Sequence, residues 1–147
     1  MISRWPRKIK PASVNDHTVY FADIMPSLAE LAGAEPPQSI DGISVLPTLM
    51  GEDASGRRQR KHEYLYWELA SGKRLAQAVR MGDWKAIRAG DGDPLELFDL
   101  SRDIAEQHNL AAHHPEIIQR IEAYLKTCRV APRPQVEPEK PPGQRYR

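Results

Sequence analysis

The stretch LELFDLSRDIAEQHNLAAHHPEII, residues 95–118, joins the end of a predicted sheet to the start of a predicted helix. LELFDL (95–100) has the short, largely alternating apolar pattern of a β-strand. Pro115 and Glu116 suit the first turn of a helix. The polar residues between strand and helix allow three interpretations: a metal site, an acid/base cluster, or a turn.

A calcium loop of the EF-hand kind conflicts with the residue types. Such a loop needs glycine at its sixth position and a bidentate glutamate at its twelfth. Counted from Asp99, those positions hold Ile104 and Leu110. Neither side chain can take the required role, so the calcium interpretation fails.

A zinc site is disfavoured because the histidines are poorly spaced. Zinc-binding histidines on one helix face stand four residues apart, whereas this stretch offers His108, His113 and His114 and no cysteine. A turn is therefore the preferred interpretation. Asp103 and Glu106 are predicted to accept hydrogen bonds from the turn backbone, and Asn109 is predicted to close it.

Three more strands are predicted before this stretch, in EYLYWEL (63–69), RLAQAVR (74–80) and WKAIR (84–88). The glycine of Gly82-Asp83 suits a type II′ hairpin turn, and four strands joined by short turns predict an antiparallel meander. The helix that follows carries one broad apolar stripe, able to cover one face of the sheet. It is expected over 115–128, with Cys128 as a core residue and not a nucleophile.

The first fifty residues predict helices. Asp23 as N-cap, Pro26 in the first turn and Gly33 as a stop define a helix over 23–33. A second helical turn is expected over 44–51. The fold class is therefore α+β, a four-stranded antiparallel sheet packed by a C-terminal helix and preceded by helices.

Composition limits the function classes. Lys plus Arg number 21 against 20 Asp plus Glu, so no overall charge favours nucleic acid or an anionic membrane. No apolar run reaches the roughly 18 residues of a spanning helix. The first residues lack the apolar core of a signal peptide, so the sequence does not indicate the cellular compartment of the protein. Residues 51–61 are predicted as a polar surface loop, and 129–147 as a proline-rich disordered tail.

The chain resembles the sulfatase family in four segments that follow the family's order. Residues 95–118 resemble its C-terminal motif, in which a strand, an Asp-Glu-Asn-Leu turn and His-Pro-Glu follow one another. SRWPRKIKP (3–11) is similar to its Arg-Trp-Pro-Gly segment, with Arg7 in place of glycine. YFADIMPSLAELAGAEPP…IDGISVLPTLMG (20–51) and the predicted sheet resemble the segments between. The similarity runs from about residue 2 to residue 128.

This resemblance implies an alkaline-phosphatase-like enzyme that cleaves sulfate esters. In that family a Cys/Ser-x-Pro-x-Arg motif supplies a formylglycine nucleophile, and a calcium ion polarises the sulfate. Cys128 does not match, because in CRVAPR the proline stands four residues on. The family's nucleophile, metal ligands and catalytic lysine and histidines lie ahead of Arg-Trp-Pro. No catalytic residue, metal ligand or cofactor is therefore assigned to this chain; calcium belongs to the full-length family.

The resemblance also predicts the domain organisation. Residues 1–50 are a helical remnant of the large α/β domain, and 62–128 are the smaller C-terminal subdomain. The large sheet is missing, so the apolar residues of the first helix, with Val45, Leu46 and Leu49, are expected to lack a complete covering surface. Unequal stability follows, with 62–128 as a protected unit. Residues 1–50 are expected to be loose, self-associated or bound to a partner.

In the family the C-terminal subdomain borders the substrate cleft. The polar and aromatic candidates for binding a sulfated ligand are Trp67, Glu68, Arg80 and Lys85. Trp67 offers a sugar-stacking platform, and Arg80 a bidentate partner for sulfate or carboxylate. The structural alternative places Trp67 and Trp84 in the core between sheet and helix. It gives the three charged residues cross-strand pairing on an exposed face.

Two hypotheses for function follow. The first is the C-terminal portion of a sulfatase acting on aryl or carbohydrate sulfates, inactive alone, whose sulfated small molecule or carbohydrate is bound through the missing catalytic domain. The second is a stand-alone binding or interaction module derived from a sulfatase. Neither hypothesis includes nucleic acid or a membrane as a partner, and both allow self-association through residues 1–50.

Overall fold

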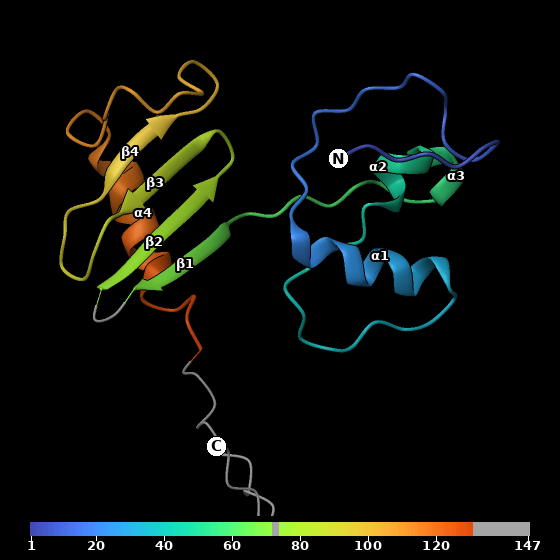
Figure 1. Cartoon of the computed structure of the whole chain (residues 1–147), viewed down its shortest axis with the longest axis horizontal. Helices are drawn as coiled ribbons and strands as arrows, with labels where there is room; N and C mark the ends of the chain where they lie inside the picture. Colours follow the sequence, from blue (N-terminus) through green and yellow to red (C-terminus); the bar gives the residue numbers. More distant parts are fainter. Residues whose placement is uncertain (72–73, 131–147) are drawn as a thin grey trace, which may run out of the picture. The chain divides into compact units, whose positions relative to one another are not determined.

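The chain divides into two units, the first ending at Glu63 and the second beginning at Tyr64. The computed structural model describes residues 1–71 and 74–130, so most of the predicted tail lies outside the described residues. The first unit contains η1 (Phe21–Asp23), α1 (Ile24–Leu31), α2 (Leu46–Met50) and α3 (Glu52–Ser55). The second contains β1 (Leu65–Ser71), β2 (Arg74–Met81), β3 (Trp84–Arg88), β4 (Glu96–Asp99) and α4 (Pro115–Leu125) (Figure 1).

The predicted antiparallel meander is confirmed. The strands form one sheet in the order β1-β2-β3-β4, and each neighbouring pair is antiparallel. Between β2 and β3 the chain turns on Gly82, which has φ +61°. That left-handed conformation is the one that a type II′ turn requires at its first central position, and glycine adopts it without steric cost.

The core of the second unit is a row of small and branched side chains beneath α4. Val79, Ala86 and Leu97 lie opposite one another on β2, β3 and β4. All three are essentially inaccessible to solvent, and so is Ile121 of α4, which belongs to the same apolar cluster. Figure 1 shows α4 crossing this face of the sheet. The α+β fold expected from the sequence is confirmed.

Trp67 does not belong to this core, so the alternative that placed it between sheet and helix is wrong. Side chains alternate along a strand, and in β1 the residues on the helix side are the even-numbered ones. Tyr64 and Tyr66 pack against the core, and Tyr64 stacks on Tyr124 of α4 with ring centroids 4.2 Å apart. Trp67 lies on the other face and is 43% exposed. Trp84 does pack against the core, as predicted.

The last helix is shorter than predicted. α4 ends at Leu125, so Cys128 lies beyond its apolar stripe. The backbone N–H of Cys128 still donates to the carbonyl of Tyr124, at 2.9 Å. This bond has the spacing of an α-helical turn, and the cysteine is half-buried.

Asp23 has a larger role than the N-cap predicted for it. α1 begins directly after it, and Gly33 at φ +69° follows the end of α1, but the Asp23 side chain makes no cap bond. It is completely buried and accepts hydrogen bonds from the backbone N–H groups of Tyr20 and Ile43, at 3.0 and 2.8 Å. Its third contact is His62 Nε2, at 2.8 Å from Oδ1. The carboxylate therefore connects three segments of the first unit.

The expected lack of cover applies to only part of the first unit. Val45 and Leu46 are buried, at 2% and 5% exposure, which corrects the prediction for those two residues. They find cover because α2 and the segment before it lie against the inner side of α1, where Ser27 bonds to the N–H of Val45. The predicted surface loop 51–61 includes the short helix α3. No described helix is long and apolar enough to cross a membrane.

Replacing Ile121 with alanine is expected to destabilise the second unit by about 2–5 kcal/mol, because a fully buried branched side chain leaves a cavity. Ile104→Ala is the matched control, since Ile104 is 81% exposed, and it is expected to change stability by no more than about 0.5 kcal/mol. Urea unfolding followed by far-ultraviolet circular dichroism measures both. Similar midpoints for the two variants would contradict the core assignment.

Candidate functional site

The polar stretch after β4 is a turn held by two of its own side chains. Asp103 Oδ2 accepts hydrogen bonds from the backbone N–H groups of Gln107 and His108, both at 2.8 Å. Asn109 Oδ1 accepts from the N–H groups of Leu97 and Ala111, at 3.1 and 3.0 Å. The roles predicted for Asp103 and Asn109 are confirmed.

Glu106 has a different role from the one predicted. Its carboxylate forms an ion pair with Lys85 of β3, at 2.5 Å between Oε1 and Nζ, instead of a bond to the turn backbone. Its own backbone has φ +56°, a left-handed conformation that is uncommon outside glycine. Both side chains are about a quarter exposed. The pair therefore attaches the tip of the turn to the sheet.

The acids of this turn do not fit a calcium ion. The hydroxyl of Ser101 lowers the pKa of Asp99, and the N–H of His108 lowers that of Asp103. Both carboxylates are thus already used as acceptors by the turn itself. Across residues 1–71 and 74–130, no three His, Cys, Asp or Glu side chains are grouped so that they could hold a metal ion.

The four candidate ligand-binding residues do not lie on one face of the sheet. Arg80 lies directly opposite Lys85 across β2 and β3, and Trp67 lies opposite Ala78, two residues before Arg80. Strand alternation places these three side chains on the face turned away from α4. Glu68 belongs to the opposite face, because its partner Gln77 alternates with Ala78. The structure therefore brings three of the four together and separates the fourth.

On the face with Trp67, the cations Arg80 and Lys85 lie directly opposite each other. Like charges directly opposite each other on a sheet repel, which contradicts the cross-strand charge pairing predicted for Arg80 and Lys85. Lys85 is neutralised by Glu106, whereas Arg80 donates from Nε to the carbonyl of Gly82 at 2.9 Å. Within the described part of the chain, Arg80 has no carboxylate partner.

Glu68 takes part in a polar row on the helix side, which the sequence analysis missed. Register places Glu68, Gln77 and Arg88 opposite one another on β1, β2 and β3. Tyr66 donates to Glu68 at 2.8 Å and accepts from Gln77 at 2.9 Å, and Arg88 donates to Gln77 at 3.2 Å. Arg88 also pairs with Glu122 of α4, and Glu68 with Arg129 at 3.0 Å. This row joins sheet and helix, and Glu68 lies at its end on β1.

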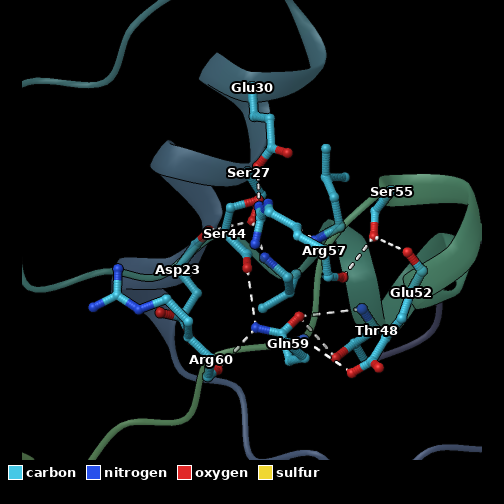
Figure 2. Close-up of polar contacts among 12 residues, drawn as sticks. Asp23, Ser27, Glu30, Ser44, Thr48, Glu52, Ser55, Arg57, Gln59 and Arg60 are labelled. Atoms are coloured by element: carbon cyan, nitrogen blue, oxygen red, sulfur yellow. Dashed lines mark hydrogen bonds and ion pairs between the residues drawn. The ribbon is translucent and has the colours of Figure 1, made fainter.

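The first unit contains a second polar network, centred on Gln59 (Figure 2). Its side-chain oxygen accepts from the N–H and hydroxyl of Thr48, at 3.1 and 2.9 Å, and its side-chain nitrogen donates to the carbonyl of Ser44 at 3.1 Å. Its backbone N–H donates to Glu52 at 3.0 Å. These contacts hold α2 and α3 together. They leave no nucleophile and base in contact, so we assign the network to folding.

The loop 51–61 contains four exposed basic residues, one of which is paired. Arg57 forms an ion pair with Glu30 of α1, at 2.6 Å. Both side chains are more than a third exposed, so the pair contributes little to stability. Arg58, Arg60 and Lys61 are exposed.

Comparison with known proteins gives the family. Residues 1–131 match the model of the family described as N-sulphoglucosamine sulphohydrolase, C-terminal. The chain belongs to the sulfatases. It matches the N-acetylgalactosamine-6-O-sulfatase of Bacteroides thetaiotaomicron with 30% identity, over 87% of this chain and 26% of that protein. The ulvan-active sulfatase of Formosa agariphila is 28% identical over 76% of this chain and 28% of that protein.

Solved structures agree with this assignment. The crystal structure of Ps i-CgsB with k-i-k-neocarrahexaose superposes with a TM-score of 0.70 and 25% identity, over 84% of this chain and 27% of that one. A putative sulfatase from Bacteroides thetaiotaomicron gives 0.61 and 31% identity, over 71% of this chain and 23% of that one. This sulfatase chain therefore spans about a quarter of the length of these relatives.

The sole cysteine of this sulfatase chain is expected to react slowly. Burial raises the pKa of the Cys128 thiol above its ordinary value, with Glu68 raising it further, so less thiolate is present at neutral pH. Because the thiolate is the nucleophile, we expect its reaction with an aromatic disulfide at pH 7.5 to be slower in the folded chain than in urea. Equal rates in the two states would show that Cys128 is neither shielded nor perturbed.

Proposed function

We propose that this chain is the C-terminal part of a sulfatase that acts on sulfated carbohydrates, and that Trp67 and Arg80 bind the sulfated ligand. The observation that carries the proposal is the placement of Trp67 and Arg80 on the sheet face turned away from α4. Trp67 is 43% exposed there, and Arg80 lies diagonally across from it with no acidic partner in the described residues. Lys85, beside Arg80, has a lesser role because Glu106 already neutralises it.

The two side chains supply complementary chemistry. The guanidinium of Arg80 is planar and permanently charged, and its NH groups are arranged to bind two oxygens of a sulfate at once. Its Nε is occupied by the carbonyl of Gly82, which fixes the orientation of the group. The indole of Trp67 offers an apolar surface to the ring of a sugar. Register sets them at the diagonal spacing of about 7–8 Å, within reach of one sulfated monosaccharide.

The substrate class is supported by the names of the relatives. One is an N-acetylgalactosamine-6-O-sulfatase, and one matching structure contains a neocarrahexaose. Both are proteins about four times as long as the part that this chain matches. We therefore assign to this chain a share in ligand binding, and the hydrolytic step to groups outside it. The exposed apolar surface of α1 makes a stand-alone binding module the weaker hypothesis.

The isolated chain is expected not to hydrolyse sulfate esters. Cys128 lies in CRVAPR, not in the nucleophile motif, and the described residues hold no group of metal ligands. A chromogenic aryl sulfate, with and without added calcium, should give the rate of a buffer blank. Release of the chromophore above that blank by the purified chain would show that it is catalytic alone.

Sulfated-sugar binding is expected to depend on Arg80. We expect Arg80→Gln and Trp67→Ala each to weaken binding of N-acetylgalactosamine 6-sulfate by at least about tenfold, a loss of about 1.4 kcal/mol. Arg74→Gln is the matched control, because Arg74 lies on the same face of β2 and already has Asp93 as a partner, at 3.8 Å. Titration followed by two-dimensional nuclear magnetic resonance measures the affinities.

The unsulfated sugar provides the second control in this experiment. Equal affinity for N-acetylgalactosamine with and without sulfate would remove the role proposed for Arg80. Unchanged binding in the Trp67 variant would remove the stacking role. A loss of binding in Arg74→Gln as large as in Arg80→Gln would show general charge attraction instead of a site.

A further inference from the structure

The loop that follows α3 concentrates positive charge in a few consecutive residues. Its cations are Arg57, Arg58, Arg60 and Lys61. All of them are exposed, and no acidic residue lies between Gly56 and His62. Across residues 1–71 and 74–130, Arg57 is the one cation of this group that has an acidic partner. We call residues 57–61 the basic segment.

The backbone of the basic segment lies outside helices and strands. Helix α3 ends at Ser55, and strand β1 begins at Leu65. In the described part of the chain, no residue from 57 to 61 takes part in a backbone–backbone hydrogen bond. An endoprotease must draw several consecutive residues into its active site, and helices and paired strands resist this, so exposed loops are the preferred places for cleavage. Cleavage in the basic segment therefore requires no backbone–backbone hydrogen bond to break.

Side-chain contacts fix the position of the basic segment while its cations stay accessible. Gln59 is half-buried and contacts Thr48 and the carbonyl of Ser44. Figure 2 shows its side chain directed away from that of Arg60. The side chain of Arg57 is held by the exposed ion pair with Glu30, which contributes little to stability. A protease can therefore take up Arg57 at a small cost in free energy.

Other exposed cations belong to hydrogen-bonded structure. The backbone N–H of Lys8 donates to the carbonyl of Trp5, and that of Arg102 donates to the carbonyl of Asp99, both at 3.1 Å. Arg80 lies within the paired strands of the sheet. These hydrogen bonds must break before a protease can bind the chain there, which favours the basic segment as the place of first cleavage.

We propose that the basic segment is a processing site for an endoprotease that recognises paired basic residues, and that it is cut between Arg58 and Gln59. Arg57 and Arg58 form the pair, and a carboxylate in the specificity pocket of the protease binds the Arg58 guanidinium. Water adds across the peptide bond. The carbonyl carbon of Arg58 gains the hydroxyl group and forms a carboxyl group, and the nitrogen of Gln59 gains the hydrogen and becomes a new amino terminus.

The cut divides the chain close to the boundary of its two units, which follows Glu63. This inference goes beyond the proposed function and does not depend on it. A sulfated polysaccharide is the competing ligand, because surface cations also bind polyanions through their summed charge. Such binding does not require a backbone free of hydrogen bonds, whereas cleavage is helped by one. The backbone of the basic segment therefore favours a protease.

The test is limited proteolysis of the full chain, with the product masses measured by mass spectrometry. Trypsin reports which lysine and arginine bonds are accessible. A subtilisin-type endoprotease specific for paired basic residues reports recognition of the pair. We expect the first cut between residues 11 and 130 to fall in the basic segment with both enzymes, and after Arg58 with the second.

The variant Arg57→Gln separates recognition from accessibility. It should slow the paired-basic protease by at least about tenfold, because the pair is lost, while trypsin still cuts in the basic segment. Arg57→Lys should restore cleavage by the paired-basic protease. Arg102→Gln is the matched control, since Arg102 is an exposed arginine of the second unit and loses the same charge. It should be cut like the unchanged chain by both enzymes.

Three results would overturn the proposal. One is a first tryptic cut elsewhere between residues 11 and 130. Another is an equal rate of the paired-basic protease on the unchanged chain and on Arg57→Gln. The third is resistance of the basic segment to both enzymes together with salt-sensitive binding of heparin that Arg57→Gln weakens, which would assign the cations to a polyanion. Circular dichroism of each variant verifies that the compared chains are folded.

Discussion

Burial of Ile121 against the row Val79, Ala86 and Leu97 is the interaction on which the second unit depends. Ala86 stands in the middle of the row and is completely buried in the same cluster as Ile121. Leu97, at its end, is also the point where the following turn returns, because its N–H donates to Asn109 and its carbonyl accepts from Leu110. The turn is thus folded onto the strand that supports the helix. Each burial of this size contributes about 1.5–3 kcal/mol.

The first unit is organised by a different constraint, the need to pair buried backbone groups. Asp23, Ser27 and Gln59 accept from or donate to the backbone of segments that form no sheet. A buried polar group without a partner costs about 1–3 kcal/mol, so these side chains decide which way α1 faces. The apolar residues of α1 are left outside as a consequence. The two units therefore differ in their interiors: polar side chains lie beside Val45 and Leu46 in the first, and an apolar row fills the second.

The sequence predicted the positions of strands and helices better than the face of the sheet on which each side chain lies. Period-two alternation located all four strands, and the pattern of Pro115 and Glu116 gave the start of α4, because these depend on neighbouring residues only. For Trp67 the sequence left two places open, a ligand-binding face and the core, because the choice of face depends on which side α4 packs. That choice is set by register: Tyr66 lies opposite Val79, and Trp67 opposite Ala78. A shift of one residue in register would exchange the faces of Tyr66 and Trp67, and the composition of the strand does not fix the register.

The same limit applies to the candidate site. Glu68 and Arg80 looked equivalent as charged strand residues, but register joins Glu68 to Gln77 and Arg88 beneath the helix. Arg80 instead meets Lys85, and a long-range contact decides which of these two cations is neutralised. Glu106 reaches Lys85 because its backbone adopts a left-handed conformation in a turn that Asp103 and Asn109 close. The charge left on the open face is therefore a product of the turn geometry, through a contact 21 residues apart in sequence.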